Sequence, residues 1–178
     1  RLEISRGGNQ GALLAMQAGF AMASQLGEAP RTLQGLVGTA IAGLMCREIE
    51  QFVQGRDSPN LYPALADLPR PFVDIEKAMK FEKETGAALD RIRLISKRLA
   101  NNLNGLQCVE AIRHYTATHD GQLPESLSDI SDVEVPKDLM SGKAFAYRRT
   151  TDGAEVQSTV PEGGNERDAV HYEIVLKK

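Results

Sequence analysis

The chain has 178 residues, of which 42% are hydrophobic and 25% are charged, and its formal net charge is −3. This composition is that of an ordinary globular protein, and the length fits one domain or two small ones. Residues 1–100 carry 13 Lys and Arg against 11 Asp and Glu, whereas residues 101–178 carry 8 against 13. The acidic C-terminal half lacks the concentrated basic face that phosphate binding requires, which argues against nucleic acid as a partner.

The N-terminal third of the sequence predicts a hairpin of two helices. Asn9 is suited to cap a helix in which apolar residues recur at helical spacing as far as Leu26. Pro30 suits the start of a second helix, which we expect to end at Gly55.

Three glycines, Gly35, Gly38 and Gly43, lie inside the second predicted helix. Each costs about 1 kcal/mol relative to alanine, so we expect a neighbouring helix to approach the backbone closely there. The Gly-x-x-Gly spacing would also suit helix pairing in a membrane. The flanks are polar, however, and the apolar window 33–46 is too short to span a bilayer, so a tight hairpin outside the membrane is favoured.

Residues 56–86 predict short segments separated by breaks. Asn60 can cap one short helix, and Pro69 and Pro71 then favour extended backbone because the residue before a proline disfavours the helical region. A second brief helix is expected from Asp74 to Gly86.

One long helix is predicted from about Ala87 to Thr118. Its segment "NNLNG" at 101–105 is poor in helix formers, so we expect a kink there or a helix in two pieces. Gly121 can take the left-handed conformation that closes a helix, and Pro124 prevents the helix from continuing. Leu123, Leu127 and Ile130 can then fold a short segment back over the helix.

The last forty residues predict three strands. "KAFAYRRT" and "AEVQSTV" flank the turn signal "TDG", and "AVHYEIVL" alternates and is rich in β-branched and aromatic residues. The prediction is therefore an α+β fold, with a helical hairpin region followed by a long helix packed on a small antiparallel three-stranded sheet. The expected regions are 1–84, all helical, and 85–178, α+β.

The N-terminal stretch "RLEISRGGNQGALLAMQAGFAMASQLG" resembles part of a tetratricopeptide unit. Gly8, Ala12 and Phe20 stand near the small and aromatic positions of that pattern. No second copy follows at a 34-residue period. A lone helical hairpin with small contact residues gives the same pattern.

The stretch "LQCVEAIRHYTATHDGQLPESLSDI…VPKDLMSGKAFAYRRTTDG" is similar to the C-terminal part of type II secretion major pseudopilins. The residues that match that pattern are Tyr115, His119, Gly121, Leu123, Pro124, Ser126, Leu127, Pro136, Asp138, Ser141, Gly142, Lys143, Phe145, Tyr147 and Arg148. The chain departs from it at Asp120, an additional residue, and at Leu139 and Ala144, which replace prolines. As a whole, the sequence resembles a family of uncharacterised bacterial envelope proteins, usually membrane-anchored, that carry this module at their C-terminus.

The histidines and several acidic residues are the candidate metal ligands of the sequence. Residues five apart on a helix differ by about 140° in direction, so His114 and His119 do not share a face, and we expect cap and surface roles for them and for Asp120. Some pseudopilins bind calcium at C-terminal loops, and the corresponding oxygens here would come from two acidic segments. These are Glu162, Asn165, Glu166 and Asp168, and Asp129, Asp132 and Glu134. Neither has EF-hand spacing, so solvated loops are predicted.

The remaining reactive or charged groups also receive structural interpretations. Cys46 and Cys108 lie in apolar runs and are predicted to be buried thiols, with a disulfide between them as the alternative. The basic segment "RIRLISKR" alternates with apolar residues at helical spacing, so a solvated helix face is favoured over an anionic partner. His171 is expected on a face of the sheet.

These patterns predict no catalytic residue, no cofactor and no metal site, and the motifs of nucleotide-binding and serine-hydrolase sites do not occur. We expect a non-enzymatic protein of the cell envelope, outside the cytoplasm, that acts in assembly or protein–protein contact, with a homo-oligomer as one arrangement. Because the chain starts at Arg1, we expect it to be a piece of a longer protein, and the family resemblance implies a membrane-anchored parent. The alternatives are a cytoplasmic tetratricopeptide-like adaptor and a metal-dependent hydrolase with its site between the two regions.

Overall fold

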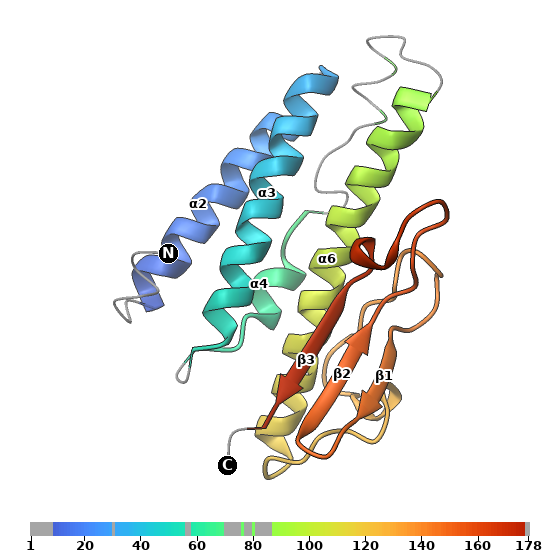
Figure 1. Cartoon of the computed structure of the whole chain (residues 1–178). Helices are drawn as coiled ribbons and strands as arrows, with labels where there is room; N and C mark the ends of the chain where they lie inside the picture. The colour runs from blue at the N-terminus through green and yellow to red at the C-terminus, as the bar shows by residue number, and fades with distance from the viewer. Residues whose placement is uncertain are drawn as a thin grey trace. The chain divides into compact units, whose positions relative to one another are not determined.

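The computed structural model describes residues 9–29, 31–55, 58–69, 76, 80 and 87–176. The helices are α2 (Asn9–Gly27), α3 (Thr32–Val53), α4 (Tyr62–Ala66) and α6 (Ala87–Thr118), and the strands are β1 (Ala146–Arg149), β2 (Gly153–Gln157) and β3 (His171–Val175) (Figure 1). The predicted α+β class, with a long helix and a small antiparallel sheet, is confirmed. Of the brief helix expected over 74–86, only Glu76 and Lys80 are described, and both are helical.

The chain forms two compact units whose boundary differs from the predicted one after residue 84. The first unit contains the described residues up to Pro59 and from Leu68 to Ala100, and the second contains Asn60–Asp67 and residues from Asn101 onward. The boundary therefore falls inside α6. Residues 60–67 belong to the second unit because Asn60 and Leu61 form hydrogen bonds with Glu110 of α6.

In the first unit, α2 and α3 form the predicted helical hairpin (Figure 1). A Cβ atom at Gly38 would lie 2.6 Å from the carbonyl oxygen of Ala23, so the expected close backbone approach is confirmed at this position. At Gly43, by contrast, nothing in the described part of the chain beyond the local helix backbone lies within 4 Å of such an atom. The close approach expected at Gly43 is therefore not found among the described residues.

The segment 101–105 does not interrupt α6, which is helical from Ala87 to Thr118. Asn101 accepts a hydrogen bond through Oδ1 from the Leu139 amide at 2.7 Å, and Asn104 donates through Nδ2 to the Lys137 carbonyl at 2.8 Å. A Cβ at Gly105 would lie 2.7 Å from Cγ1 of Val170. The expected two-piece helix is wrong because these weak helix formers serve contacts with residues distant in the sequence.

The C-terminus of α6 has the geometry of a Schellman motif. Both Asp120 (φ 51°) and Gly121 (φ 79°) are left-handed, and the Gly121 amide donates to the Thr116 carbonyl at 2.9 Å. The left-handed conformation predicted for Gly121 is confirmed, and the additional residue Asp120 shares it. The ring of His119 stacks on Tyr115 with centroids 3.7 Å apart, so His119 belongs to this helix end.

In the second unit, the three strands form an antiparallel sheet in the order β1-β2-β3 that covers the apolar side of α6 (Figure 1). Cys108, Ala111 and Ile112 of the helix share one core with side chains of the sheet and of the segment before it. That core is completed by Leu123, Leu127, Ile130, Phe145, Ala154, Val156 and Val170. The predicted packing of the strands and the returning segment on the long helix is confirmed.

Candidate functional site

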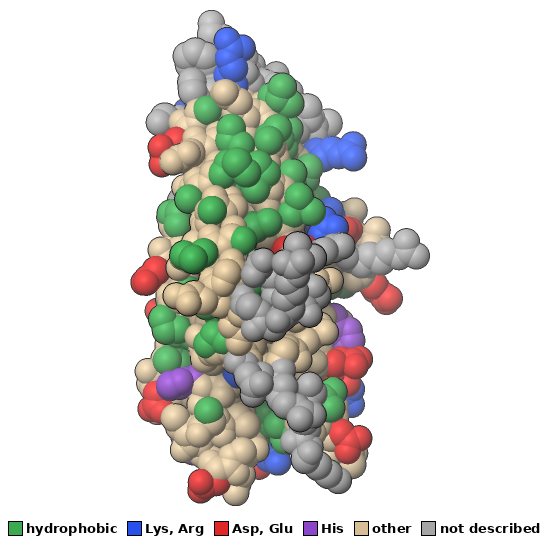
Figure 2. Space-filling model, turned by 90° about the vertical axis from the view of Figure 1, so that its left-hand side faces the viewer, with side chains coloured by type: hydrophobic (Ala, Val, Ile, Leu, Met, Phe, Trp, Pro, Cys, Tyr) green, Lys and Arg blue, Asp and Glu red, His purple; other side chains and the backbone are tan. Residues whose placement is uncertain are grey.

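The outward sides of α2 and α3 carry an unusual exposed surface, which we call the outer face. It comprises fifteen exposed residues: nine apolar ones, five glutamines and Arg47. The apolar members are Leu14, Ala15, Ala18, Ala21, Met22, Leu33, Val37, Ala40 and Leu44. Hydrophobic side chains gather over this part of the molecule in Figure 2. Monomeric soluble proteins rarely expose large contiguous apolar patches, and such patches mark interaction sites.

The outer face is distinct from the packed interior of the hairpin. In α3 the buried residues Thr39, Cys46 and Ile49 and the exposed residues Leu33 and Leu44 centre on nearly opposite sides of the helix, at 100° per residue. In α2 the buried and exposed sets are likewise opposed. Helices that are apolar on all sides are normally buried on all sides. These two helices therefore have one apolar side covered and a second one open.

The sequence already contained the signal for this surface. Between Asn9 and Cys46 the only charged residues are Glu28 and Arg31, and both lie outside α2 and α3. The sequence pattern of this region predicts a helical hairpin but not the outer face, because an apolar helix pattern does not indicate how many sides of the helix contact a neighbour.

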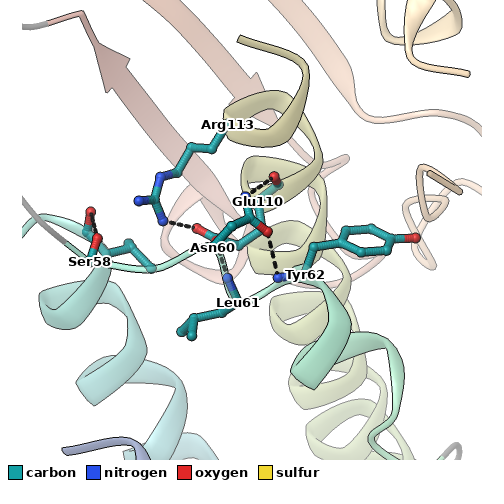
Figure 3. A network of polar contacts seen from close by, with 7 residues as sticks. Ser58, Asn60, Leu61, Tyr62, Glu110 and Arg113 are labelled. Carbon is teal, nitrogen blue, oxygen red and sulfur yellow. Dashed lines mark hydrogen bonds and ion pairs between the residues drawn. The ribbon is translucent and has the colours of Figure 1, made fainter. Parts of the chain in front are cut away.

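Buried polar groups are the other candidates for function, and the first is Glu110 of α6, which is fully buried. Its Oε2 accepts the Leu61 amide at 2.5 Å, its Oε1 pairs with Nη1 of Arg113 at 2.5 Å, and its carbonyl accepts Nδ2 of Asn60 at 2.8 Å. Figure 3 shows the side chains of Arg113 and Asn60 and the backbone of Leu61 around Glu110. Asn60 also accepts the Tyr62 amide at 2.9 Å, but the N-cap position of α4 is held by Leu61, one residue after the predicted cap. Both carboxylate oxygens are occupied, and the group fastens the segment 60–67 to the helix.

The second buried carboxylate is Asp138, which lies in the turn before β1 and is 1% exposed. It accepts hydrogen bonds from the Met140 amide at 2.9 Å, the Ser141 hydroxyl at 2.7 Å and the Thr159 amide at 3.0 Å. Burial alone would raise the pKa of Asp138, but these donors together outweigh it and hold the pKa below its ordinary value. The carboxylate therefore stays ionised and closes the turn.

The two cysteines are free thiols, and both are buried. The buried-thiol prediction is confirmed, and the alternative disulfide is absent. Burial raises the pKa of the Cys108 thiol to about 12. A thiol with such a pKa is protonated at neutral pH and is a poor nucleophile and metal ligand.

The structure places the histidines and the two acidic segments apart from one another. His119 is at the end of α6, while His171 is exposed on β3 as predicted. In the acidic segments, Asp129 accepts the Ser126 amide and Asp168 accepts the Asn165 amide, so each carboxylate serves a local turn. Within the described ranges, no three His, Cys, Asp or Glu side chains gather as a metal site would require.

Comparisons with known proteins give no match. No protein family, no curated protein and no solved structure matches the chain. Among the described helices, none has the length and apolar character needed to span a bilayer. The similarity to pseudopilins and to tetratricopeptide units therefore rests on the sequence patterns alone.

Proposed function

We propose that the chain is a non-enzymatic protein of the cell envelope that acts by binding a protein through the outer face of α2 and α3. The observation that carries the proposal is the exposure of five large aliphatic side chains, Leu14, Met22, Leu33, Val37 and Leu44, on helices with one charged exposed residue. Their exposed fractions range from 43% to 72%. Covering such a surface removes apolar area from water, and this favours binding by about 25 cal/mol for each Å² of apolar area buried.

The chemistry of the outer face specifies the kind of partner. Arg47 is the single charged residue of the outer face, so this surface offers little electrostatic attraction to a strongly acidic or basic peptide. Alanines and glutamines between the large side chains leave a smooth surface on which another helix can pack. An apolar helical surface is the partner that these residues favour.

The location outside the cytoplasm is supported by the second unit. Its helix end, its returning segment and its three strands occur in the order expected from the pseudopilin-like sequence pattern. In that interpretation the second unit is the envelope module and the hairpin is the contact element. A cytoplasmic tetratricopeptide-like adaptor is the second candidate, and the α2/α3 hairpin favours it.

Photo-crosslinking in cells tests the proposal. A photoreactive residue at Val37 should give covalent adducts with protein, whereas the same residue at Val175, which is 66% exposed on β3, should give few. Fractionation of the same cells reports the compartment: adducts in the envelope fraction support the envelope role, and adducts confined to the cytosol support the adaptor. Equal labelling from the two positions would contradict protein binding at the outer face.

A further inference from the structure

We propose that the occupant of the α3 part of the outer face is a second copy of this chain, packed antiparallel about a two-fold axis. The inference deepens the proposed function and rests on it, because it names the partner of the same surface. Four residues of α3 carry it: Leu33, Val37, Ala40 and Leu44, which we call the α3 stripe. All four are exposed in the single chain.

The spacing of the α3 stripe is that of a helix-pairing seam. Its members are separated by four, three and four residues, which is the alternation of the a and d positions of a heptad. This spacing reads the same in both directions about a point between Val37 and Ala40. An antiparallel copy would therefore place Leu33 opposite the second copy's Leu44, and Val37 opposite its Ala40. A two-fold interface requires this kind of self-complementary surface.

Repulsion between the two Arg47 side chains disfavours the parallel arrangement. Arg47 continues the seam at the next d position after Leu44 and is the charged member of the outer face. In a parallel pair the two Arg47 side chains would oppose each other across helix axes about 8–10 Å apart. In the antiparallel pair they lie about 17 residues apart along the axis, or roughly 25 Å, which exceeds the screening length of about 8 Å at physiological salt.

Gly43 provides an independent observation. A glycine inside a helix is unfavourable, and Gly38 of the same helix is explained by the backbone of α2 beside it. Gly43 has no such neighbour among the described residues, yet it adjoins Ala40 and Leu44 of the α3 stripe. A second copy seated on the stripe would supply the missing neighbour, because small residues let two helices approach closely.

Sedimentation equilibrium of the purified 178-residue chain is the first test. We expect a monomer–dimer equilibrium with a dissociation constant in the micromolar range. Val37→Glu should raise that constant at least about 100-fold, because the carboxylate would be buried without a partner at the contact. Val175→Glu is the matched control, since the same substitution is made at an exposed position of the second unit, and it should leave the constant unchanged. Equal unfolding midpoints of the two variants would show that both fold.

Engineered cysteines test the direction. A mixture of Leu33→Cys and Leu44→Cys chains should form the mixed disulfide, whereas Leu33→Cys alone should not, because its two thiols would lie about 16 Å apart along the axis. The native cysteines are buried, so the unmodified chain serves as the blank. Self-linking of Leu33→Cys without the mixed product would overturn the antiparallel arrangement.

The two proposals can fail separately. If the chain is monomeric at all concentrations and Val37 still crosslinks to a different protein in cells, self-pairing is wrong and the contact role of the outer face stands. If neither pairing nor crosslinking occurs, both are wrong.

Discussion

The outer face of the helical hairpin and the outward side of the sheet are both exposed surfaces of one chain, but their chemistry is opposite. Across the sheet, Arg148, Glu155 and Glu173 stand in register on adjacent strands, and Arg148 pairs with Glu155 at 2.8 Å. His171 is exposed on the same side. The charged side chains of the sheet keep its outward side hydrated, whereas α2 and α3 expose mainly apolar residues and glutamines. The lack of charge on the hairpin is therefore local, and it is on this uncharged surface that we propose the partner binds.

The interiors of the two units differ as well. The second unit is fastened by buried polar side chains of α6, which bind backbone groups 33 to 49 residues away in sequence, and by Asp138 in the turn before β1, which binds the Thr159 amide 21 residues away. The hairpin is fastened by small residues that bring two helix backbones together at Gly38. Substitutions should consequently act through lost hydrogen bonds in one unit and through steric fit in the other.

The largest effect is expected at Glu110. Glu110→Ala would leave the buried Leu61 amide without its acceptor and Arg113 without its carboxylate, so we expect a loss of about 3 kcal/mol in the free energy of unfolding, measured by urea titration. Glu125→Ala is the control, because Glu125 pairs with Arg149 at the surface and its side chain is 83% exposed. That variant should lose less than about 1 kcal/mol. Similar losses in the two variants would contradict the fastening role of Glu110.

The contribution of Asp138 to the free energy of unfolding should depend on pH. Its pKa is lower in the folded chain than in the unfolded one, so its stabilising effect is complete above about pH 4 and is lost as the pH falls through the folded value. Asp138→Asn should cost about 2 kcal/mol at pH 7, and the difference from the wild type should shrink in acid. Urea titrations of both proteins at several pH values measure this. A difference that does not change with pH would show that the carboxylate charge is unimportant.

Gly38 tests the packing of the hairpin. Gly38→Ala would press a methyl group against the Ala23 carbonyl, which is backbone and cannot rotate away, so we expect a loss of about 2 kcal/mol by thermal or urea unfolding. A gain in stability, as helix propensity alone would give, would show that the helices separate easily at this point.

A substitution at Gly43 in the same helix should change stability in the opposite direction, and its effect should be the smallest of the four. Gly43→Ala meets no neighbour in the described part of the chain, so the single chain should gain up to about 1 kcal/mol from helix propensity. Urea unfolding should be measured at protein concentrations low enough to keep the chain monomeric. If the inferred pairing holds, the same variant should weaken dimerisation at higher concentration.

The sequence allowed the element order, the α+β class and the packing of the strands on the long helix to be predicted, because periodicity and turn residues are local signals. It predicted the long helix but also a break at Asn101–Gly105 that does not occur, since the contacts that offset the weak propensity of this segment come from Leu139, Lys137 and Val170. The burial of Glu110 was equally hidden, as two of its three partners, Asn60 and Leu61, lie far upstream in the sequence. For the outer face, the absence of charge was visible, but which helix sides remain open depends on tertiary packing.

The strap formed by residues 60–67 has a consequence for dissecting the protein. The polypeptide passes from one unit to the other after Pro59, again after Asp67 and a third time after Ala100. Neither unit is consequently a continuous piece of chain. A single cut at Ala100 would separate Glu110 from residues 60–67, which hydrogen-bond to it. A C-terminal fragment would need that octapeptide supplied separately to regain its full complement of hydrogen bonds.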